Sequence, residues 1–308
     1  MAEFKNEFSW SNSRNSLFEE CKRKYYYQYY GCWVGWSKVK ADRVTRTLYV
    51  LKHLQNRWLW KGTAVHNEIA KILKQLVSTG NLTPIETSLA RVTDLMRDEF
   101  RFSRDGSYWE KDGSLRDIIA LFEHEYNVNI PGERWKKNYE EVMECIRNFY
   151  KSDVLQKVKG LDRSAILSID SLTPTLFSFN SERIYVNLDL AYRMEGEIEI
   201  VDWKTGAGES DELQFLVYTI YVSEVLENPL EKISVIEYNL LSDQKTIYKF
   251  SPDKIEKAKN YINESVARMK GYLQNAPDNT AVMTDFPRTE EKKKCDSCTF
   301  KKICFDLP

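Results

Sequence analysis

The sequence predicts a mixed α/β fold: a mixed sheet flanked by helices, with a helical insertion and a C-terminal segment in which cysteines form a metal cluster site. Apolar residues recur at helical spacing in residues 62–78, 211–227 and 253–274, and they alternate with polar residues, at strand spacing, in residues 184–190. The chain of 308 residues is longer than the roughly 100–200 residues of a typical domain. We therefore expect one large core with an insertion, or two domains.

The first half of the chain is predicted to be helical. Residues 1–80 contain a helix that starts at Ser13 and runs to about Tyr30, and a second helix that runs from Gly62–Thr63 to Ser78 and ends at Gly80. Residues 81–164 are charged and compatible with helices, and proline and glycine interrupt them. These features identify residues 81–164 as a helical insertion.

Residues 165–280 are expected to form the central sheet and the helices that cover it. The elements expected in order are strands at 184–190 and 197–204, a helix at 211–227, a hairpin of 235–241 and 245–250, and a helix at 253–274. Ser251–Pro252 are suited to start the last helix, because proline is favoured in the first turn. Residues 281–308 are the C-terminal cysteine segment.

Charge is balanced over the chain but segregated along it. Lys and Arg total 45 and Asp and Glu total 46, which argues against a protein that binds nucleic acid by bulk charge. Residues 21–61, however, hold ten basic residues, one acidic residue and ten aromatic residues, whereas residues 185–212 hold eight acidic and two basic residues. The basic aromatic stretch fits a nucleic-acid backbone whose bases stack on rings. The tyrosines alone fit equally well an aromatic helix in the core whose lysines extend outward, but the whole basic stretch fits that alternative less well.

The cysteines are best interpreted in a reducing compartment. No stretch approaches the roughly 20 apolar residues that span a bilayer, and the N-terminus has no secretory pattern, so we expect a cytoplasmic protein without a membrane segment. Disulfides are rare there, so the six cysteines need another explanation. Cys32 and Cys145 are isolated and are predicted to be small buried hydrophobes.

The segment EIEIVDWKTG, residues 197–206, carries the strongest chemical signal. Residues two apart on a strand share a face, so Asp202 and Lys204 project together, and Asp189 on the neighbouring predicted strand can reach the same point. Two converging carboxylates repel each other unless a cation such as a divalent metal lies between them. A charged lysine beside the metal can orient a water or offset negative charge in a transition state. The alternative is a plain salt bridge between Asp202 and Lys204.

Four cysteines indicate a second metal site. Cys295, Cys298 and Cys304 have the spacing C-x2-C-x5-C, which lets three thiolates share one metal, and Cys21 is the expected fourth ligand. Such a site would join the two ends of the chain, so that metal binding would be coupled to folding. Zinc fits four thiolates as well as an iron–sulfur cluster does.

These residues carry a resemblance to a known family. Asp189 followed by Asp202-Trp203-Lys204-Thr205-Gly206 resembles the PD-(D/E)XK nuclease superfamily, in its RecB-like branch. The resemblance implies a restriction-endonuclease-like fold in residues 165–280. Leu188 stands where the proline that gave the superfamily its name is found, and that proline is often missing in this branch.

The resemblance also implies roles for residues outside the strand. His66 in GTAVHNEIA is similar to the branch's helical histidine, which binds metal together with Asp189, Asp202 and the carbonyl of Trp203. Gln214 and Tyr218 are similar to its Q-x3-Y motif, and at this spacing they share one helical face, where both can reach a phosphate or support the site.

The cysteine pattern is similar to that of iron–sulfur nucleases of the same branch. The resemblance implies a 4Fe–4S cluster held by Cys21, Cys295, Cys298 and Cys304, and it favours this cluster over zinc. It assigns the first cluster cysteine and the metal-binding histidine to residues 1–80 and the rest of the cluster site to residues 281–308. It does not extend to the insertion at 81–160.

Together these features predict a deoxyribonuclease that uses Mg²⁺ or Mn²⁺. The resemblance implies an exonuclease acting on single-stranded DNA ends, in DNA repair or CRISPR adaptation, with helicase or CRISPR-adaptation proteins as partners. One alternative is a catalytically idle iron–sulfur or zinc subunit that binds DNA within a larger complex. A weaker alternative is a zinc-ribbon interaction protein.

Overall fold

A computed structural model describes residues 5–116, 118–170, 175–208 and 210–305. A five-stranded mixed sheet lies at its centre, as the sequence predicts. Only the β7–β8 pair is parallel within this sheet, and the other three pairs are antiparallel. The strands, in spatial order, are β3 (Ile166–Ile169), β6 (Leu190–Met194), β7 (Glu197–Lys204), β8 (Ile233–Asn239) and β9 (Gln244–Tyr248).

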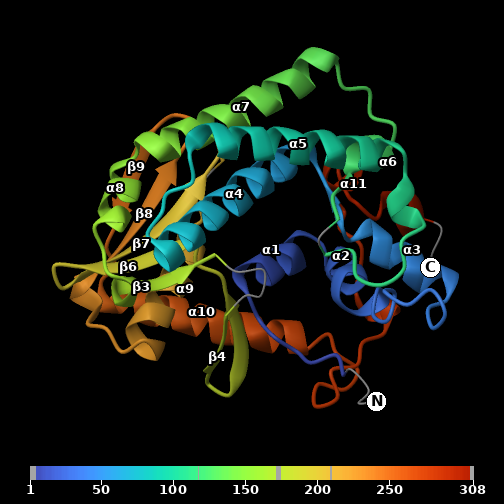
Figure 1. Cartoon of the computed structure of the whole chain (residues 1–308). Coiled ribbons are helices and arrows are strands. Elements are labelled where there is room, and N and C mark those ends of the chain that lie inside the picture. Colours follow the sequence, from blue (N-terminus) through green and yellow to red (C-terminus); the bar gives the residue numbers. More distant parts are fainter. Residues whose placement is uncertain (1–4, 117, 171–174, 209, 306–308) are drawn as a thin grey trace.

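Helices and two small sheets surround the central sheet (Figure 1). The small sheets pair β1 (Leu54–Gln55) with β2 (Ala120–Leu121), and β4 (Thr175–Phe179) with β5 (Glu182–Val186). The α-helices are α1 (Asn12–Glu20), α2 (Lys22–Tyr26), α3 (Arg43–Leu51), α4 (Arg57–Thr79), α5 (Ile85–Arg104), α6 (Phe122–Glu125), α7 (Gly132–Lys151), α8 (Asp153–Lys159), α9 (Glu212–Ile220), α10 (Pro252–Lys270), α11 (Lys292–Asp296) and α12 (Lys301–Cys304).

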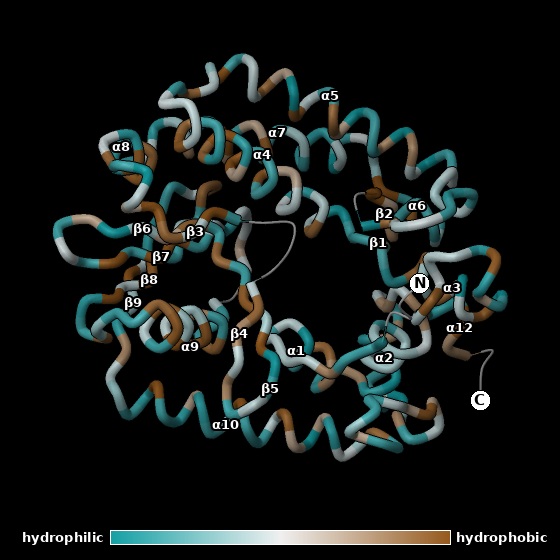
Figure 2. The backbone as a smooth tube through the Cα atoms, turned by 60° about the horizontal axis from the view of Figure 1, so that its bottom comes forward, coloured by the Kyte–Doolittle hydropathy of each residue, from teal (hydrophilic) through white to brown (hydrophobic). Residues whose placement is uncertain are grey.

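The alternation of side chains along the strands divides the core into two layers. Val201 and Trp203 face α4, α7 and α8, whereas Ile198 and Ile200 face α9 and α10. The Trp203 ring packs edge-on against Phe149 of α7, with 5.6 Å between ring centroids. Figure 1 shows α4, α5 and α7 above the sheet and α10 below it, and Figure 2 shows that the central strands carry apolar segments. Helices of residues 81–164 therefore cover the sheet directly and share its core.

A third apolar cluster joins the two ends of the chain. Phe300 and Ile303, near the C-terminus, are buried with Tyr27 and Leu51. The backbone N–H of Arg23 also donates to the carbonyl of Pro287 at 3.0 Å. Residues more than 250 positions apart in the sequence are thus side by side, as the four-cysteine prediction requires.

Several local predictions are confirmed. Gly80 ends α4 in the left-handed conformation with φ 74°, where glycine lacks the steric penalty of other residues. The Ser251 side chain caps α10, and Pro252 is its first residue. β8 and β9 form the expected hairpin.

No helix in the described part of the chain combines the length and apolarity needed to cross a bilayer.

Three of the differences from the predicted boundaries have a clear physical cause. The helix expected from Ser13 to Tyr30 is interrupted at Cys21, which is extended and caps α2 with its thiol. α4 begins at Arg57, because the Asn56 side chain accepts the N–H groups of the first turn. The strand expected at 184–190 is divided between β5 and β6, because the first part pairs with β4 and the last residue belongs to the central sheet.

Candidate active site

Asp202 and Lys204 lie together at the end of β7, as strand periodicity predicts. Asp202 is 2% exposed, and its Oδ2 is 2.7 Å from Lys204 Nζ. The same Oδ2 is buried and accepts no directed hydrogen bond among the described residues. Lys204 therefore gives this oxygen charge compensation without a well-oriented donor.

Asp189 lies in the short connection between β5 and β6 and links β7 to α4. Its Oδ2 accepts the N–H of Trp203 at 2.8 Å, and its Oδ1 is 3.1 Å from Nδ1 of His66. The N–H and C=O of one strand residue point to the same side of the strand. The Trp203 carbonyl, predicted as a metal ligand, is therefore directed to the side on which Asp189 lies.

Asp170 joins this group, although the sequence did not single it out. Each of His66, Asp170 and Asp189 has one potential metal-ligand atom, and these three atoms lie within 4.8 Å of one another. Asp170 donates its backbone N–H to the Asp189 carbonyl at 2.9 Å, and its Oδ1 accepts Asn187 Nδ2 at 2.5 Å. The only sequence signal was the short apolar run Ile166–Ile169 that ends just before Asp170.

Burial and the neighbouring carboxylates shift the pKa values of the titratable side chains in this site. Burial raises the pKa of Asp202 to about 6, and the Asp189 charge adds to this effect while Lys204 opposes it. Burial alone would lower the pKa of His66, but Asp189, Asp202 and Asp170 raise it to about 9. Burial also opposes the charge on Lys204, yet Asp202 raises the pKa of Lys204 above its usual value. The site thus attracts cations strongly.

Gln214 and Tyr218 lie on the same face of α9 and reach the carboxylate end of β7. The Tyr218 hydroxyl donates to Asp202 Oδ1 at 3.2 Å, and Gln214 Nε2 donates to the Tyr218 oxygen at 2.5 Å. Lys204 Nζ donates to Gln214 Oε1 at 3.4 Å, which closes the network. Asp211 caps α9 by accepting the N–H of Gln214 at 3.2 Å. The structure therefore brings the residues singled out by the motifs to one place.

Comparison with known proteins agrees with this geometry. A family model described as the PD-(D/E)XK nuclease superfamily matches residues 9–305. The chain belongs to this superfamily. Its members are generally nucleases that act on nucleic acids and typically use Mg²⁺ or Mn²⁺. A search of curated proteins found no match to the chain.

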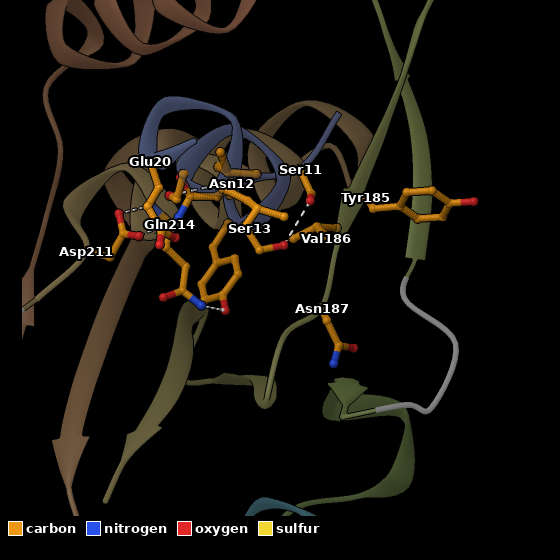
Figure 3. Close-up of a pocket in the computed structure, with 13 residues that line it drawn as sticks. Ser11, Asn12, Ser13, Glu20, Tyr185, Val186, Asn187, Asp211 and Gln214 are labelled. Atoms are coloured by element: carbon orange, nitrogen blue, oxygen red, sulfur yellow. Dashed lines mark hydrogen bonds between the residues drawn. The ribbon is translucent and has the colours of Figure 1, made fainter. Parts of the chain in front are cut away.

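Two cavities flank the candidate active site of this superfamily member. One, of about 520 Å³, lies between α1, β5 and α9, and Figure 3 shows Asp211, Gln214 and Asn187 around it. The other, of about 640 Å³, lies beside α4 and α5 and is lined by His66 and Asp170. Asn187 lines both cavities, so they adjoin the site from two sides.

All four cysteines of the predicted cluster line a separate cavity of about 510 Å³. Cys21 Sγ accepts the Lys24 N–H at 3.5 Å, and Cys298 Sγ accepts the Phe300 N–H at 3.4 Å. Backbone N–H groups directed at sulfur stabilise thiolates and iron–sulfur clusters. Burial raises the pKa of the Cys298 thiol to about 11, although Lys24 and the Phe300 N–H oppose this. The four cysteines therefore border one cavity, but among the described residues no three of their sulfurs lie within 4.8 Å of one another.

The remaining cysteines and the tyrosines of residues 21–61 are largely structural. Cys32 and Cys145 are buried, which confirms their prediction as small core residues. Tyr25 and Tyr27 are also buried and pack against other aromatic rings, Tyr25 edge-on against Phe18 and Tyr27 in a tilted contact with Phe300, so they cannot receive bases. For these two tyrosines the core interpretation is the right one. Trp58, in contrast, is 56% exposed.

Proposed function

We propose that this chain is a metal-dependent deoxyribonuclease whose active site lies at the end of β7. The observation that carries the proposal is the convergence of Asp189, Asp202 and Lys204 with His66 of α4. These four side chains come from three segments of the chain, and their burial and charge favour a bound cation. Family membership independently supports hydrolysis of nucleic acid.

The oxygen-rich donor set suits Mg²⁺ or Mn²⁺. His66, Asp189, Asp202 and the Trp203 carbonyl are the proposed ligands, and Asp170 is added to them because its carboxylate adjoins His66 and Asp189. When bound, the metal lowers the pKa of a water and polarises the phosphate. Asp202 lies outside the group of ligand atoms within 4.8 Å, and its buried Oδ2, which is ion-paired with Lys204 but accepts no directed hydrogen bond, is the oxygen proposed to face the cation.

Lys204 acts as a cation in this proposal and not as a base. Its raised pKa keeps the ammonium group charged near neutral pH. The Asp202 and Gln214 side chains hold Nζ in place. A fixed ammonium can orient the attacking water and stabilise the negative charge that develops on the phosphate. Tyr218 holds both Asp202 and Gln214 and so fixes the geometry.

The two flanking cavities are proposed as the path of a single DNA strand. Lys71, Lys74 and Arg116 line the cavity next to His66, so its walls can attract a phosphate backbone. Ser11, Ser13 and Gln214 line the cavity on the other side and offer neutral hydrogen-bonding groups, and Glu20 and Asp211 add two carboxylates (Figure 3). Exonuclease action on single-stranded ends fits a strand that enters by the basic cavity and whose product leaves through this second cavity, where the carboxylates repel phosphate.

We further propose that Cys21, Cys295, Cys298 and Cys304 hold a 4Fe–4S cluster, which places the chain in the iron–sulfur RecB-like branch. The shared cavity and the N–H groups directed at Cys21 and Cys298 support the proposal. A brown anaerobic preparation with iron and sulfide in equal amounts is expected. A colourless preparation with stoichiometric zinc would contradict it. The branch's known roles make DNA repair or CRISPR adaptation the proposed setting.

The nuclease proposal is tested on full-length protein purified without oxygen. Labelled single-stranded DNA should be cleaved with Mn²⁺ and not with chelator, and Lys204→Ala should abolish cleavage while the circular dichroism spectrum is retained. Lys249→Ala is the matched control, because this exposed lysine lies just beyond the end of β9 and pairs with Glu197, at the opposite end of β7 from Asp202. Equal cleavage by the wild type and Lys204→Ala would exclude this active site. Metal-independent DNA binding without any turnover would indicate an idle binding subunit.

A further inference from the structure

A cavity of about 520 Å³ lies on the outer side of α5, away from the active site. Leu95 and Glu99 of α5 line the cavity beside His66, whereas Arg97 and Arg101 line this outer cavity. Residues two apart on a helix are about 200° apart around its axis, so the two cavities use opposite faces of α5. The outer cavity is therefore separate from the proposed catalytic centre.

Aromatic rings from three helices form the floor of this cavity, which we call the outer groove. Trp60 of α4, Phe100 of α5, and Trp135 and Tyr139 of α7 line it. Trp135 packs edge-on against Phe100, with 5.2 Å between centroids, and against Trp60 at 6.2 Å. Because Phe100, Trp135 and Tyr139 are only partly buried, ring surface remains open to a ligand.

The polar ring atoms of Trp60 and Tyr139 already have partners inside the protein. Trp60 Nε1 donates to Glu99 at 2.6 Å, and the Tyr139 hydroxyl is 3.0 Å from Thr93 Oγ1. The floor therefore offers flat apolar surface and few free hydrogen-bonding groups. Such a surface can stack a planar ring but has little means to distinguish one base from another.

Three arginines form the rim of the outer groove. Arg97, Arg101 and Arg104 are all exposed and follow one another at helical spacing, over about 10 Å of α5. Arg97 pairs with Asp94 at 2.9 Å, while Arg101 has no ion pair among the described residues. Guanidinium groups bind phosphate in bidentate fashion. The rim thus selects an anionic ligand.

We propose that the outer groove binds single-stranded nucleic acid as a second site, with bases stacked on Trp135 and Phe100 and phosphates held by Arg101 and Arg97. An acidic peptide would satisfy the arginines but leave the ring surface without a planar partner. A nucleotide chain satisfies both. This choice of ligand rests on the proposed function in one respect, since the proposed substrate of the active site is also a nucleic acid. The second site would hold a long strand while its end is processed.

The test compares binding of a long and a short oligothymidylate, of about 30 and about 6 nucleotides, by fluorescence anisotropy in chelator, where no cleavage occurs. The double variant Arg97→Gln/Arg101→Gln should bind the long strand about tenfold more weakly, with a salt slope smaller by about 0.7 for each lost phosphate contact. Its affinity for the short strand should be unchanged, because that oligonucleotide fits within the active-site cavities.

Arg147→Gln is the matched control. Arg147 is exposed and pairs with an acidic residue three positions earlier, as Arg97 does, but it lies about 18 Å along α7 from Trp135. It should bind both strands as the wild type does. For stacking, Trp135→Phe should retain long-strand affinity and Trp135→Leu should lower it, with thermal melting used to confirm that both are folded.

Equal long-strand affinity of the wild type and the double arginine variant would overturn the proposal. So would polyglutamate binding that depends on Arg101 while oligothymidylate binding does not, since the groove would then serve an acidic protein. The nuclease proposal fails separately. A wild type that does not cleave DNA, yet binds the long strand through Arg101, supports the outer groove and rejects only the catalytic assignment.

Discussion

The carboxylate site, which contains Asp189 and Asp202, and the cysteine cavity differ in how the fold positions their side chains. Asp189 and Asp202 are nearly buried and are fixed by the register of β6 and β7 in the central sheet. The cysteines, in contrast, lie on or beside very short helices: Cys295 on α11 and Cys304 on α12, which have five and four residues, Cys298 between these two helices, and Cys21 at the cap of the five-residue α2. Isolated helices of this length are not stable on their own. The apolar core therefore organises the first site, whereas the second would need the proposed metal cluster to fix its geometry.

The largest expected effect tests the first half of this comparison. Asp202→Asn should lower the cleavage rate by about a thousandfold or more, because it removes a proposed metal ligand and the partner of Lys204. The fold should remain intact, because the buried Asp202 carboxylate, with its raised pKa, is costly to ionise. Single-turnover cleavage and urea denaturation measure the two effects. A large loss of stability would show that the pair is structural.

The second prediction concerns the cysteine cavity. Cys298→Ser should remove the bound iron, or zinc, and lower the melting temperature more than Asp202→Asn does, because metal binding there is coupled to folding of the chain ends. Metal analysis and thermal melting of anaerobic protein provide the measurement. Cys32→Ala serves as the control, since this buried cysteine lies outside the cavity. Loss of metal in both variants would contradict the four-cysteine assignment.

A smaller effect is expected at Asp170. Asp170→Asn should weaken Mn²⁺ binding by about 10–100-fold, and saturating Mn²⁺ should restore most of the cleavage rate. Calorimetric titration of Mn²⁺ separates this from a direct catalytic effect. Asp162→Asn changes an exposed carboxylate of the same region and should leave the affinity unaltered. If Asp170→Asn also leaves it unaltered, Asp170 is not a ligand.

The smallest predicted effect is a dependence of the free energy of unfolding on pH, which arises at the carboxylate site. In metal-free protein the pKa of His66 is raised from 6.5 to about 9, so its charged form stabilises the fold. This contribution is complete below pH 6.5 and is lost as the pH rises through 9. The free energy of unfolding in chelator should fall over that interval, and His66→Gln should flatten the change. An unchanged slope in His66→Gln would show that His66 is not coupled to the carboxylates.

Local patterns predicted much of the site because they depend on near neighbours. Strand period placed Asp202 and Lys204 on one face, and helical spacing placed Gln214 beside Tyr218. Local patterns did not predict contacts between segments that lie far apart in the sequence. Asp170 has no motif of its own, and it reaches His66 only because β3 pairs with β6 at the sheet edge. Likewise the stretch around Tyr25 and Tyr27 resembles a base-binding surface until the C-terminal segment covers it.

The sequence by itself determined the superfamily motif, the mixed α/β class and the C-x2-C-x5-C spacing, since each is read from short segments whose pattern depends on near neighbours. The domain boundaries at 80, 164 and 280 stay predictions. Only the tertiary structure decided that residues 81–164 cover the sheet and that Arg101 lines one cavity with the rings of Trp135 and Phe100, and it places Cys21 and Cys304, which were predicted to share a metal, at one cavity. The physical reason is that such contacts depend on sheet register and helix packing between segments far apart in the chain, which local periodicity does not encode.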